Sequence, residues 1–359
     1  MISIHTFELA NEYTTKEFNR LLSCGYKNAK QNKNRLGKST KYKQLDVRVD
    51  DSLAHQGITI EYHNGNFKKF IKLIVNPSEV LGGCDMKLWK ANNTNTERLI
   101  EILKIHIDDY FNSEYKLNDF LLTRVEVTAN LYVGKDNIPA YVNLMHKIGK
   151  VKKFSPKYSK SEYSTGRINK AHSFDLEGKS NNMGFTVYDK ESDLSNKLNK
   201  AKTSDTKLKL KSKIKESKGI LRIEVRLKKR KAIIAALQDI TKETDISTVK
   251  EIKLVSRKCR DIFWSTFTTI IPNGDFYKLS DAEEIVNTSD LKKKQKEKML
   301  RLLKLIPEKK SVYLALKELK VRDTDDVMDW FKELDLSPVT ISTRGEVDYL
   351  RNLFDYLEA

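Results

Sequence analysis

Three short segments of the sequence carry side chains that could cut or join a phosphodiester bond. They are LLTRVEVTANL (121–131), MGFTVYDKESDL (183–194) and GILRIEVRLKKR (219–230). Successive side chains of a β-strand point to opposite faces, so each segment divides into an apolar row and a polar row. The polar rows contain Glu126, then Tyr188 with Lys190, and then Glu224. If the three strands share a sheet, these four side chains gather on one face.

Tyrosine, lysine and two glutamates together predict attack on a phosphodiester. A phenol with a pKa near 10 is a weak nucleophile at neutral pH unless a cation stabilises the phenolate or a base takes its proton. Lys190, two residues after Tyr188, would supply that cation or protonate the leaving oxygen. Two neighbouring carboxylates repel, so Glu126 and Glu224 predict a divalent ion, Mg²⁺ or Mn²⁺, that polarises the phosphate oxygens. The product would be a 5′-phosphotyrosine and a free 3′-hydroxyl.

The positive charge of the chain is concentrated in one region. The 359 residues contain 67 Lys and Arg against 49 Asp and Glu, a net charge of +18. Residues 150–231 alone hold 24 Lys and Arg against 9 Asp and Glu. Local positive charge attracts polyanions through counterion release, which makes nucleic acid the expected partner. The residues predicted to bind it directly are Arg124, Arg222, Arg226, Lys228, Lys229 and Arg230. The run 197–219 fits this role and equally fits a solvated helix or loop.

Several protein classes are not expected. No window approaches the roughly 18 apolar residues of a membrane span, and the N-terminus lacks the pattern of a secretory signal. The three cysteines, Cys24, Cys84 and Cys259, are far apart and form no CxxC pair. The sequence therefore predicts a cytoplasmic protein with no membrane partner and no disulfide framework.

The order of the expected elements is mixed. A hairpin is predicted over 57–75, helices over 95–113 and 138–149, and strands over 120–133, 183–190 and 219–229. This order predicts an α+β fold with a largely antiparallel central sheet and helices packed on it. A helical C-terminal region follows, with helical spacing in the segments 290–306, 311–320 and 324–338. We expect a catalytic and DNA-binding domain over 1–238 and a helical accessory domain over 239–359.

Four motifs in order resemble the gene II replication initiators of filamentous bacteriophages and their bacterial relatives. They are PSEVLGG (77–83), TRVEVT (123–128), VYDK (187–190) and GILRIEVRLKKR (219–230), within roughly residues 57–232. The resemblance implies a protein that nicks one strand at a double-stranded origin, starts rolling-circle replication and rejoins the displaced strand. It implies Tyr188 as the nucleophile and Glu126 and Glu224 as metal ligands. It also implies DNA partners in a bacterial host, of phage or plasmid origin, and leaves host replication proteins open as further partners.

This chain departs from the family pattern at two acidic positions. Glu126 stands where the family often has Asp, and its longer side chain would shift a metal site. Asp193 stands where relatives often have Glu. The six histidines include no His-hydrophobic-His pair, so a metal here would have mainly oxygen ligands.

Each candidate also has a purely structural interpretation. Tyr188 could be a packing residue, and Glu126 and Glu224 could belong to cross-strand ion pairs. Four aromatic residues among the basic ones are candidates for stacking on bases, with some of them expected in the core: Phe154, Tyr158, Tyr163 and Phe174. The main alternative function is a non-catalytic protein that binds single-stranded nucleic acid or origin DNA. A recombinase or relaxase with the same phosphotyrosine chemistry is the third.

Overall fold

The structure is a computed structural model that describes residues 1–31, 37–38, 46–84, 86–157, 172–201, 204–238, 246–319, 324–344 and 346–358. The first half contains β1 (Ile2–Tyr13), α1 (Thr15–Gln31), β2 (Gly37–Lys38), β3 (Asp46–Asp50), β4 (Ile58–Asn64), β5 (Lys69–Val75), α2 (Pro77–Val80), α3 (Asn93–Tyr110), β6 (Leu121–Tyr132), α4 (Ile138–Ile148) and β7 (Phe154–Pro156). The second half contains β8 (Ser173–Gly178), β9 (Met183–Asp189), α6 (Lys190–Lys200), α7 (Ser204–Glu216), β10 (Ile220–Leu227), α8 (Arg230–Leu237), α9 (Thr248–Ile270), β11 (Phe276–Tyr277), α10 (Leu279–Thr288), α11 (Lys293–Lys309), α12 (Val312–Glu318), α13 (Thr324–Glu333), β12 (Tyr349–Leu350) and α14 (Asp355–Glu358).

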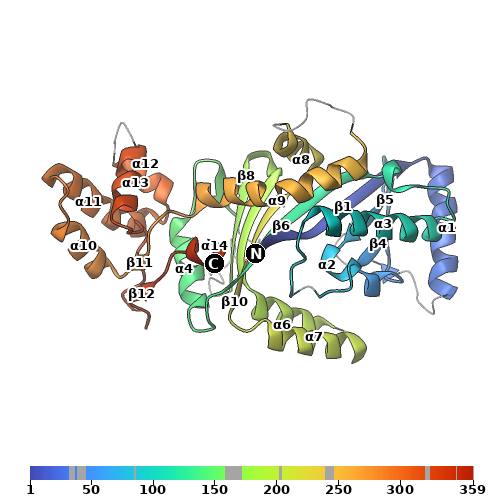
Figure 1. Cartoon of the computed structure of the whole chain (residues 1–359), viewed down its shortest axis with the longest axis horizontal. Coiled ribbons are helices and arrows are strands. Elements are labelled where there is room, and N and C mark those ends of the chain that lie inside the picture. Colours follow the sequence, from blue (N-terminus) through green and yellow to red (C-terminus); the bar gives the residue numbers. More distant parts are fainter. Residues whose placement is uncertain are drawn as a thin grey trace. The chain divides into compact units, whose positions relative to one another are not determined.

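The strands β1 to β10 form a sheet in the order β2-β3-β4-β5-β1-β6-β10-β9-β8-β7 (Figure 1). The pairs β1–β5, β3–β4, β4–β5, β7–β8 and β8–β9 run antiparallel. Helices dominate the chain after β10. The predicted α+β class, with a largely antiparallel sheet and a helical C-terminal region, is confirmed.

The described residues group into two compact units, each built from two segments of the chain. Unit 1 comprises Met1–Thr128 and Arg226–Ile262, and unit 2 comprises Ala129–Val225 and Phe263–Ala359. The chain thus passes from one unit to the other within β6, β10 and α9. This grouping differs from the linear division at residue 238 that the sequence predicts.

In unit 1, α3 covers one face of the hairpin formed by β4 and β5. The side chain of Asn92 accepts the backbone N–H of Asn95 and begins the helix. Leu99, Leu103 and Ile107 follow at a helical spacing and are buried. Burying an aliphatic side chain of this size contributes about 1.5–3 kcal/mol, so this face anchors the helix.

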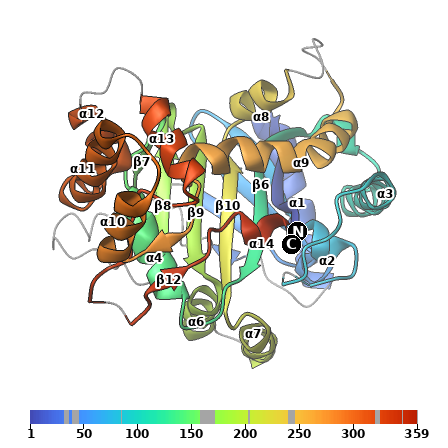
Figure 2. The ribbon, with the colours of Figure 1, turned by 60° about the vertical axis from the view of Figure 1, so that its left-hand side comes forward.

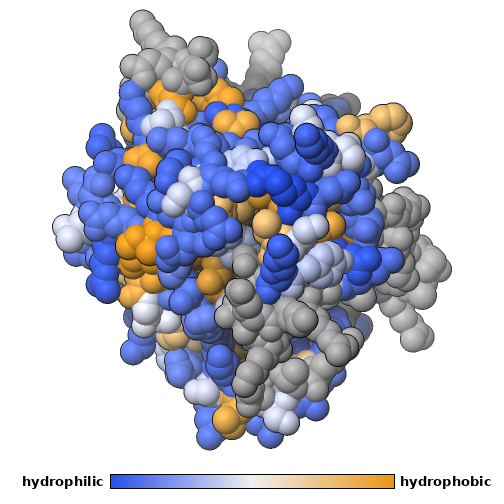
Figure 3. Space-filling view, turned by 90° about the vertical axis from the view of Figure 1, so that its right-hand side faces the viewer, coloured by the Kyte–Doolittle hydropathy of each residue, from blue (hydrophilic) through white to orange (hydrophobic). Residues whose placement is uncertain are grey.

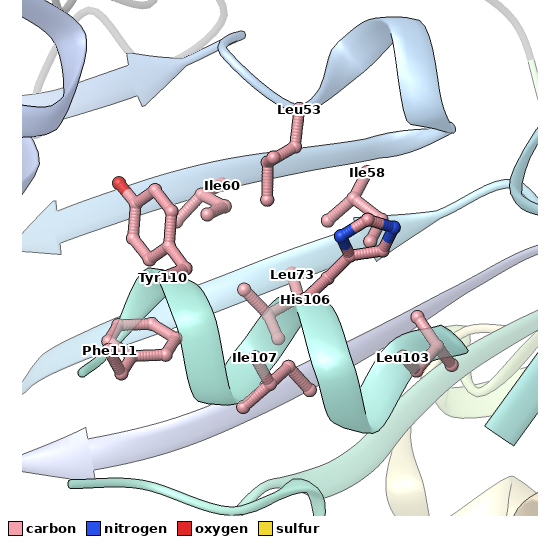
Figure 4. A pocket seen from close by; sticks show the side chains of 9 residues that line it. All are labelled: Leu53, Ile58, Ile60, Leu73, Leu103, His106, Ile107, Tyr110 and Phe111. Carbon is pink, nitrogen blue, oxygen red and sulfur yellow. The ribbon is translucent and has the colours of Figure 1, made fainter. Parts of the chain in front are cut away.

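A small cavity remains between α3 and the hairpin (Figure 4). Its volume of about 10 Å³ is close to the minimum for one water molecule. Aliphatic side chains such as Ile58 and Leu73 line most of it, and burial lowers the pKa of His106 at its wall. A cavity with so few polar groups has no means of binding a phosphate, so the candidate site lies elsewhere.

In unit 2, α4 packs on β8 and β9, and α6 and α7 pack on each other. The C-terminal helices have a core of their own, because Met299, Leu302 and Ile306 lie at a helical spacing on α11 and are fully buried. The predicted C-terminal helices correspond to α11, α12 and α13. Their cores are apolar and their outer faces charged, as expected of helices that pack by one face.

The surface on the side of α1 is mainly hydrophilic, and its apolar residues lie in separate patches (Figure 3). Among the helices that the structure describes, none combines the length and the apolar run that a bilayer crossing requires.

Candidate active site

Tyr188 and Glu224 meet in unit 2. Phe185 and Val187 are fully buried and fix β9 in the sheet, and the half-buried Tyr188 has the opposite orientation to Val187. The Tyr188 hydroxyl donates a hydrogen bond to Glu224 Oε1 on β10 at 2.7 Å. The sequence therefore placed these two side chains on the same face correctly.

Lys190 lies close to Tyr188, but not for the reason that the sequence suggested. Lys190 is the first residue of α6, so the strand periodicity that was expected to align it with Tyr188 has already ended. The helix begins there because the Asp189 side chain accepts the backbone N–H of Glu191. The Lys190 side chain is only 1% exposed, with Nζ 3.4 Å from Asp193 Oδ2 and 5.8 Å from the centre of the Tyr188 ring. It can act on the phenol as a positive charge.

The charged row of β10 is more deeply buried than the sequence indicates. Arg222 has an exposed fraction of 0% and Glu224 one of 6%. Arg222 Nε donates to Asn130 Oδ1 on β6 at 2.8 Å. In this structure Arg222 is therefore held inside unit 2, which differs from its predicted role as a direct nucleic-acid contact. A buried guanidinium is costly unless it is partnered, so Asn130 contributes to the site by orienting it.

These surroundings keep the Tyr188 phenol protonated. Burial raises its pKa well above the ordinary 10.0, and the negative charge of Glu224 raises it further, while the charge of Arg222 acts in the opposite direction. Tyr188 therefore cannot act as a preformed phenolate at neutral pH. Attack by its oxygen requires a group that accepts the proton, and Glu224 is already in hydrogen-bond contact.

In unit 1, Glu126 belongs to a ladder of alternating charges across four strands. The ladder consists of Glu61 on β4, Lys72 on β5, Glu8 on β1, and Arg124 and Glu126 on β6. Lys72 Nζ lies 3.7 Å from Glu61 Oε2 and 3.3 Å from Glu8 Oε2. Arg124 lies 3.3 Å from Glu8 and also pairs with Glu126. Arg124, predicted to bind nucleic acid, is thus engaged within the sheet.

Both oxygens of Glu126 contact polar groups of unit 1. Oε1 pairs with Arg124, while Oε2 accepts the Thr6 hydroxyl at 2.6 Å and lies 3.7 Å from His5 Nδ1. Burial alone would raise the pKa of this carboxyl. The nearby His5 side chain, the charge of Arg124 and the hydrogen bond from Thr6 outweigh it and lower the pKa to about 2. Glu126 is therefore ionised over the whole physiological range.

The basic residues that follow Glu224 differ in their surroundings. Arg226 and Lys228 are half-buried, and Lys229 is exposed. Arg230 lies in α8, where Nη2 is 2.8 Å from Glu251 Oε1 of α9, a side chain with an exposed fraction of 2%. Arg230 thus holds two helices of unit 1 together, and its predicted role as a direct nucleic-acid contact differs from this arrangement.

The predicted stacking residues have different outcomes. Phe154 and Phe174 are buried, so they are core residues in this structure. Tyr158 and Tyr163 lie outside the described residues.

The metal site stays a prediction. Within the described residues, no three His, Cys, Asp or Glu side chains cluster closely enough to hold a metal ion. Glu126 belongs to unit 1 and Glu224 to unit 2. Mg²⁺ commonly binds through one or two carboxylates together with substrate phosphates, so a carboxylate such as Glu224 suits an ion that arrives with DNA.

Several residues around these carboxylates were not predicted from the sequence. Asn130 lies in the predicted strand 120–133 but carries no charge or motif that would indicate its contact with Arg222. Thr6, His5 and Glu8 lie on β1, which the sequence did not predict. The alternation of buried Phe7 and Leu9 with polar neighbours is the signal that could have identified this strand.

Comparisons with known proteins give structural likenesses but no sequence family. No family model matches the sequence, and no curated protein matches it. Among solved structures, the chain is similar to a rolling circle replication initiator protein from Geobacillus stearothermophilus, with 9% sequence identity and a TM-score of 0.28. The match covers 73% of this chain and 96% of that chain. A likeness at this TM-score carries no functional argument.

Proposed function

We propose that the chain is a rolling-circle DNA replication initiator that nicks one strand at a double-stranded origin through Tyr188 and rejoins the displaced strand. The observation that carries this proposal is the 2.7 Å hydrogen bond from the Tyr188 hydroxyl to Glu224 Oε1. The local excess of basic residues over 150–231 and the four motifs in family order support DNA as the substrate.

The reaction that fits this geometry is a transesterification. The Tyr188 oxygen attacks the phosphorus as its proton passes to Glu224, so that the Oη–P bond forms while the P–O3′ bond breaks. The 3′ oxygen takes up a proton and leaves as a hydroxyl, and the 5′ phosphate stays on the tyrosine. Rejoining is the same step in reverse, which requires no external energy source.

Positive charges near Tyr188 would stabilise the extra negative charge of the transition state. Lys190 Nζ and the buried Arg222 both act on the phenol region electrostatically. We propose Lys190 as the group that steadies the developing charge or protonates the 3′ oxygen. Mg²⁺ or Mn²⁺, with Glu224 as a ligand in this unit, would polarise the non-bridging phosphate oxygens.

One observation favours the alternative of a non-catalytic DNA-binding protein. The pKa of Tyr188 is raised well above 10.0, so the phenol alone is less reactive than an exposed tyrosine. The two functions share the basic charge and differ in one product. Only the nicking enzyme forms a covalent bond between Tyr188 and a 5′ phosphate.

The test uses supercoiled circular DNA that contains the coding segment of this chain and its flanks, incubated with Mg²⁺ and analysed on a denaturing gel. Wild type should relax the circle and remain attached to a 5′ end. Tyr188→Phe should bind the DNA and form no adduct. Glu224→Gln should reduce nicking by at least a hundredfold, the usual scale of general-base catalysis, and retain affinity.

Tyr349→Phe is the matched control, because Tyr349 also donates its hydroxyl to a carboxylate, Asp275 Oδ2, at 2.5 Å. It should nick like wild type. An adduct that persists in Tyr188→Phe would reject Tyr188 as the nucleophile. If wild type binds this DNA and forms no adduct, the result would favour the non-catalytic alternative.

A further inference from the structure

The helices α6 and α7 connect the strand of Tyr188 to the strand of Glu224. The chain enters α6 directly after β9 and leaves α7 four residues before β10 begins at Ile220. The two helices pack on each other and lie together beyond one end of these strands (Figures 1 and 2). This hairpin contains most of the lysine-rich run 197–219, for which the sequence left two interpretations open.

The outer face of α7 carries a stripe of like charges. Lys207, Lys211 and Lys215 are four residues apart, so they lie above one another on one side of the helix, and all three are exposed. Leu210 and Ile214, which flank this stripe along one edge, are half-buried. Three lysines in this arrangement repel one another and disfavour the helix. A bound polyanion would remove that repulsion.

Acidic neighbours distinguish the lysines of α6 from this stripe. On α6, Lys190 and Lys197 both contact Asp193, at 3.4 and 2.9 Å. Within the part of the chain that the structure describes, no ion pair or hydrogen bond is recorded for Lys207, Lys211 or Lys215. The charges of Lys207, Lys211 and Lys215 are therefore available to an external anion.

An exposed aromatic side chain lies at the C-terminal end of α7. Tyr132, at the end of β6, is 73% exposed. Its ring lies against Gly219, where a Cβ would come within 3.1 Å of the Tyr132 Cε2 atom. Gly219 has a φ of +76°, and its carbonyl accepts the Val133 N–H at 3.0 Å. The contact thus fixes Tyr132 at the junction between α7 and β10.

Lysines along a helix with an exposed aromatic ring at its end suit single-stranded nucleic acid. Proteins that bind single strands without sequence preference combine two features. Positively charged side chains follow the sugar-phosphate backbone of the nucleic acid, and aromatic rings stack on its bases. A membrane surface fits less well, because Leu208 is the one strongly exposed apolar side chain on the described part of α7.

We propose that Lys207, Lys211, Lys215 and Tyr132 form a binding surface for the single strand on which the site of Tyr188 acts. The inference rests on the proposed function, since it assigns a strand-holding role to the connection between the two site strands. The lysines contact phosphates, and Tyr132 stacks on a base.

The test measures the affinity for a labelled single-stranded oligonucleotide of mixed sequence as a function of salt, by fluorescence anisotropy. The triple variant Lys207→Gln, Lys211→Gln, Lys215→Gln should lower the slope of log K against log salt by about 2, at roughly 0.7 per phosphate contact. The control Lys293→Gln, Lys294→Gln, Arg301→Gln removes the same charge from exposed positions of α11 and should keep the wild-type slope. Equal slopes for the two triple variants would overturn the proposal.

The role of Tyr132 is tested with two further variants. Tyr132→Leu should weaken binding about 5- to 150-fold, the usual range for one lost base stack, whereas Tyr132→Phe should bind like wild type because the ring remains. Equal affinity for the Leu and Phe variants would reject the stacking role. Circular dichroism of every variant checks that α7 and the sheet still form.

Two measurements separate this inference from the proposed nicking activity. A covalent adduct with an unchanged slope in the α7 triple variant would leave the nicking activity in place and reject the surface. A reduced slope without an adduct in wild type would support the surface and reject the nicking activity. If the α7 triple variant lost binding to vesicles of anionic lipid and kept wild-type DNA binding, the three lysines would be reassigned to a membrane surface.

Discussion

Tyr188 donates its phenolic hydrogen to Glu224 across 2.7 Å, between two adjacent strands of unit 2. This bond has two effects on the proposed chemistry. It provides an acceptor for the proton that the nucleophile must lose, and it stabilises the protonated phenol until a phosphate is in place.

The first prediction concerns the ionisation of Tyr188. Its pKa is raised well above 10.0 by burial first and by Glu224 second. A group with a raised pKa makes its full contribution to the free energy of unfolding below pH 10. That contribution is lost as the pH rises above 10, because the tyrosine then ionises in the unfolded chain and stays protonated in the folded one. Ultraviolet titration should therefore give equal tyrosinate absorbance for wild type and Tyr188→Phe near pH 10. Glu224→Gln should lower the pKa of Tyr188, and a wild-type phenol that ionises at its ordinary pKa would contradict this assignment.

The second prediction concerns acid stability and Glu126. Its pKa is lowered to about 2 from the ordinary 4.5, so it contributes stability above pH 4.5 that is lost as the pH falls towards 2. Glu126→Gln should lower the free energy of unfolding at pH 7 by about 3 kcal/mol, and the difference should vanish near pH 2. The control Glu12→Gln removes an exposed ion pair with Lys68 and should cost at most about 1 kcal/mol. A constant difference between pH 7 and pH 2 would show that Glu126 acts by packing.

The third prediction separates Arg230 from its neighbour Lys229. Arg230→Ala leaves the buried Glu251 without its ion pair and should cost about 3–5 kcal/mol in denaturant unfolding. The double variant Arg230→Met, Glu251→Leu should recover most of that loss. Lys229→Ala should cost at most about 1 kcal/mol, the scale of an exposed ion pair, and lower the salt slope of DNA binding by about 1. If Arg230→Ala kept the wild-type free energy of unfolding and bound DNA more weakly, Arg230 would be a DNA contact and not a structural ion-pair residue.

The fourth prediction concerns the divalent ion. Mg²⁺ commonly binds through one or two carboxylates together with substrate phosphates, so we expect an ion bound through Glu224 to take a DNA phosphate as a further ligand. A chelator should abolish nicking and leave the unfolding temperature of the DNA-free protein unchanged. Calorimetry should detect Mg²⁺ binding only when DNA is present. Undiminished nicking in the chelator would reject the metal requirement, and a lower unfolding temperature would indicate a preformed site.

The sequence by itself determined several of the elements, including the three strands at the site and the faces of those strands. Alternation of Leu221 and Ile223 with Arg222 and Glu224 predicts a strand with one charged face, because the pleat places every second side chain on the same side. The helical spacing of α3 and α11 likewise predicts which faces are buried. Local patterns of this kind depend only on the nearest residues along the chain.

Tertiary structure decided what surrounds these charges. The charged side chains Arg222 and Glu224 of β10, which the sequence placed on an accessible face, are buried, and Arg222 is hydrogen-bonded to Asn130. Lys190 approaches Tyr188 from the helix α6 and not from the strand β9. Arg124 and Glu126 join a ladder with Glu8, which lies more than a hundred residues earlier in the chain. Burial and ion pairing depend on residues distant in the sequence. A local pattern contains no information about them, and they become visible only when the strands are assembled into a sheet.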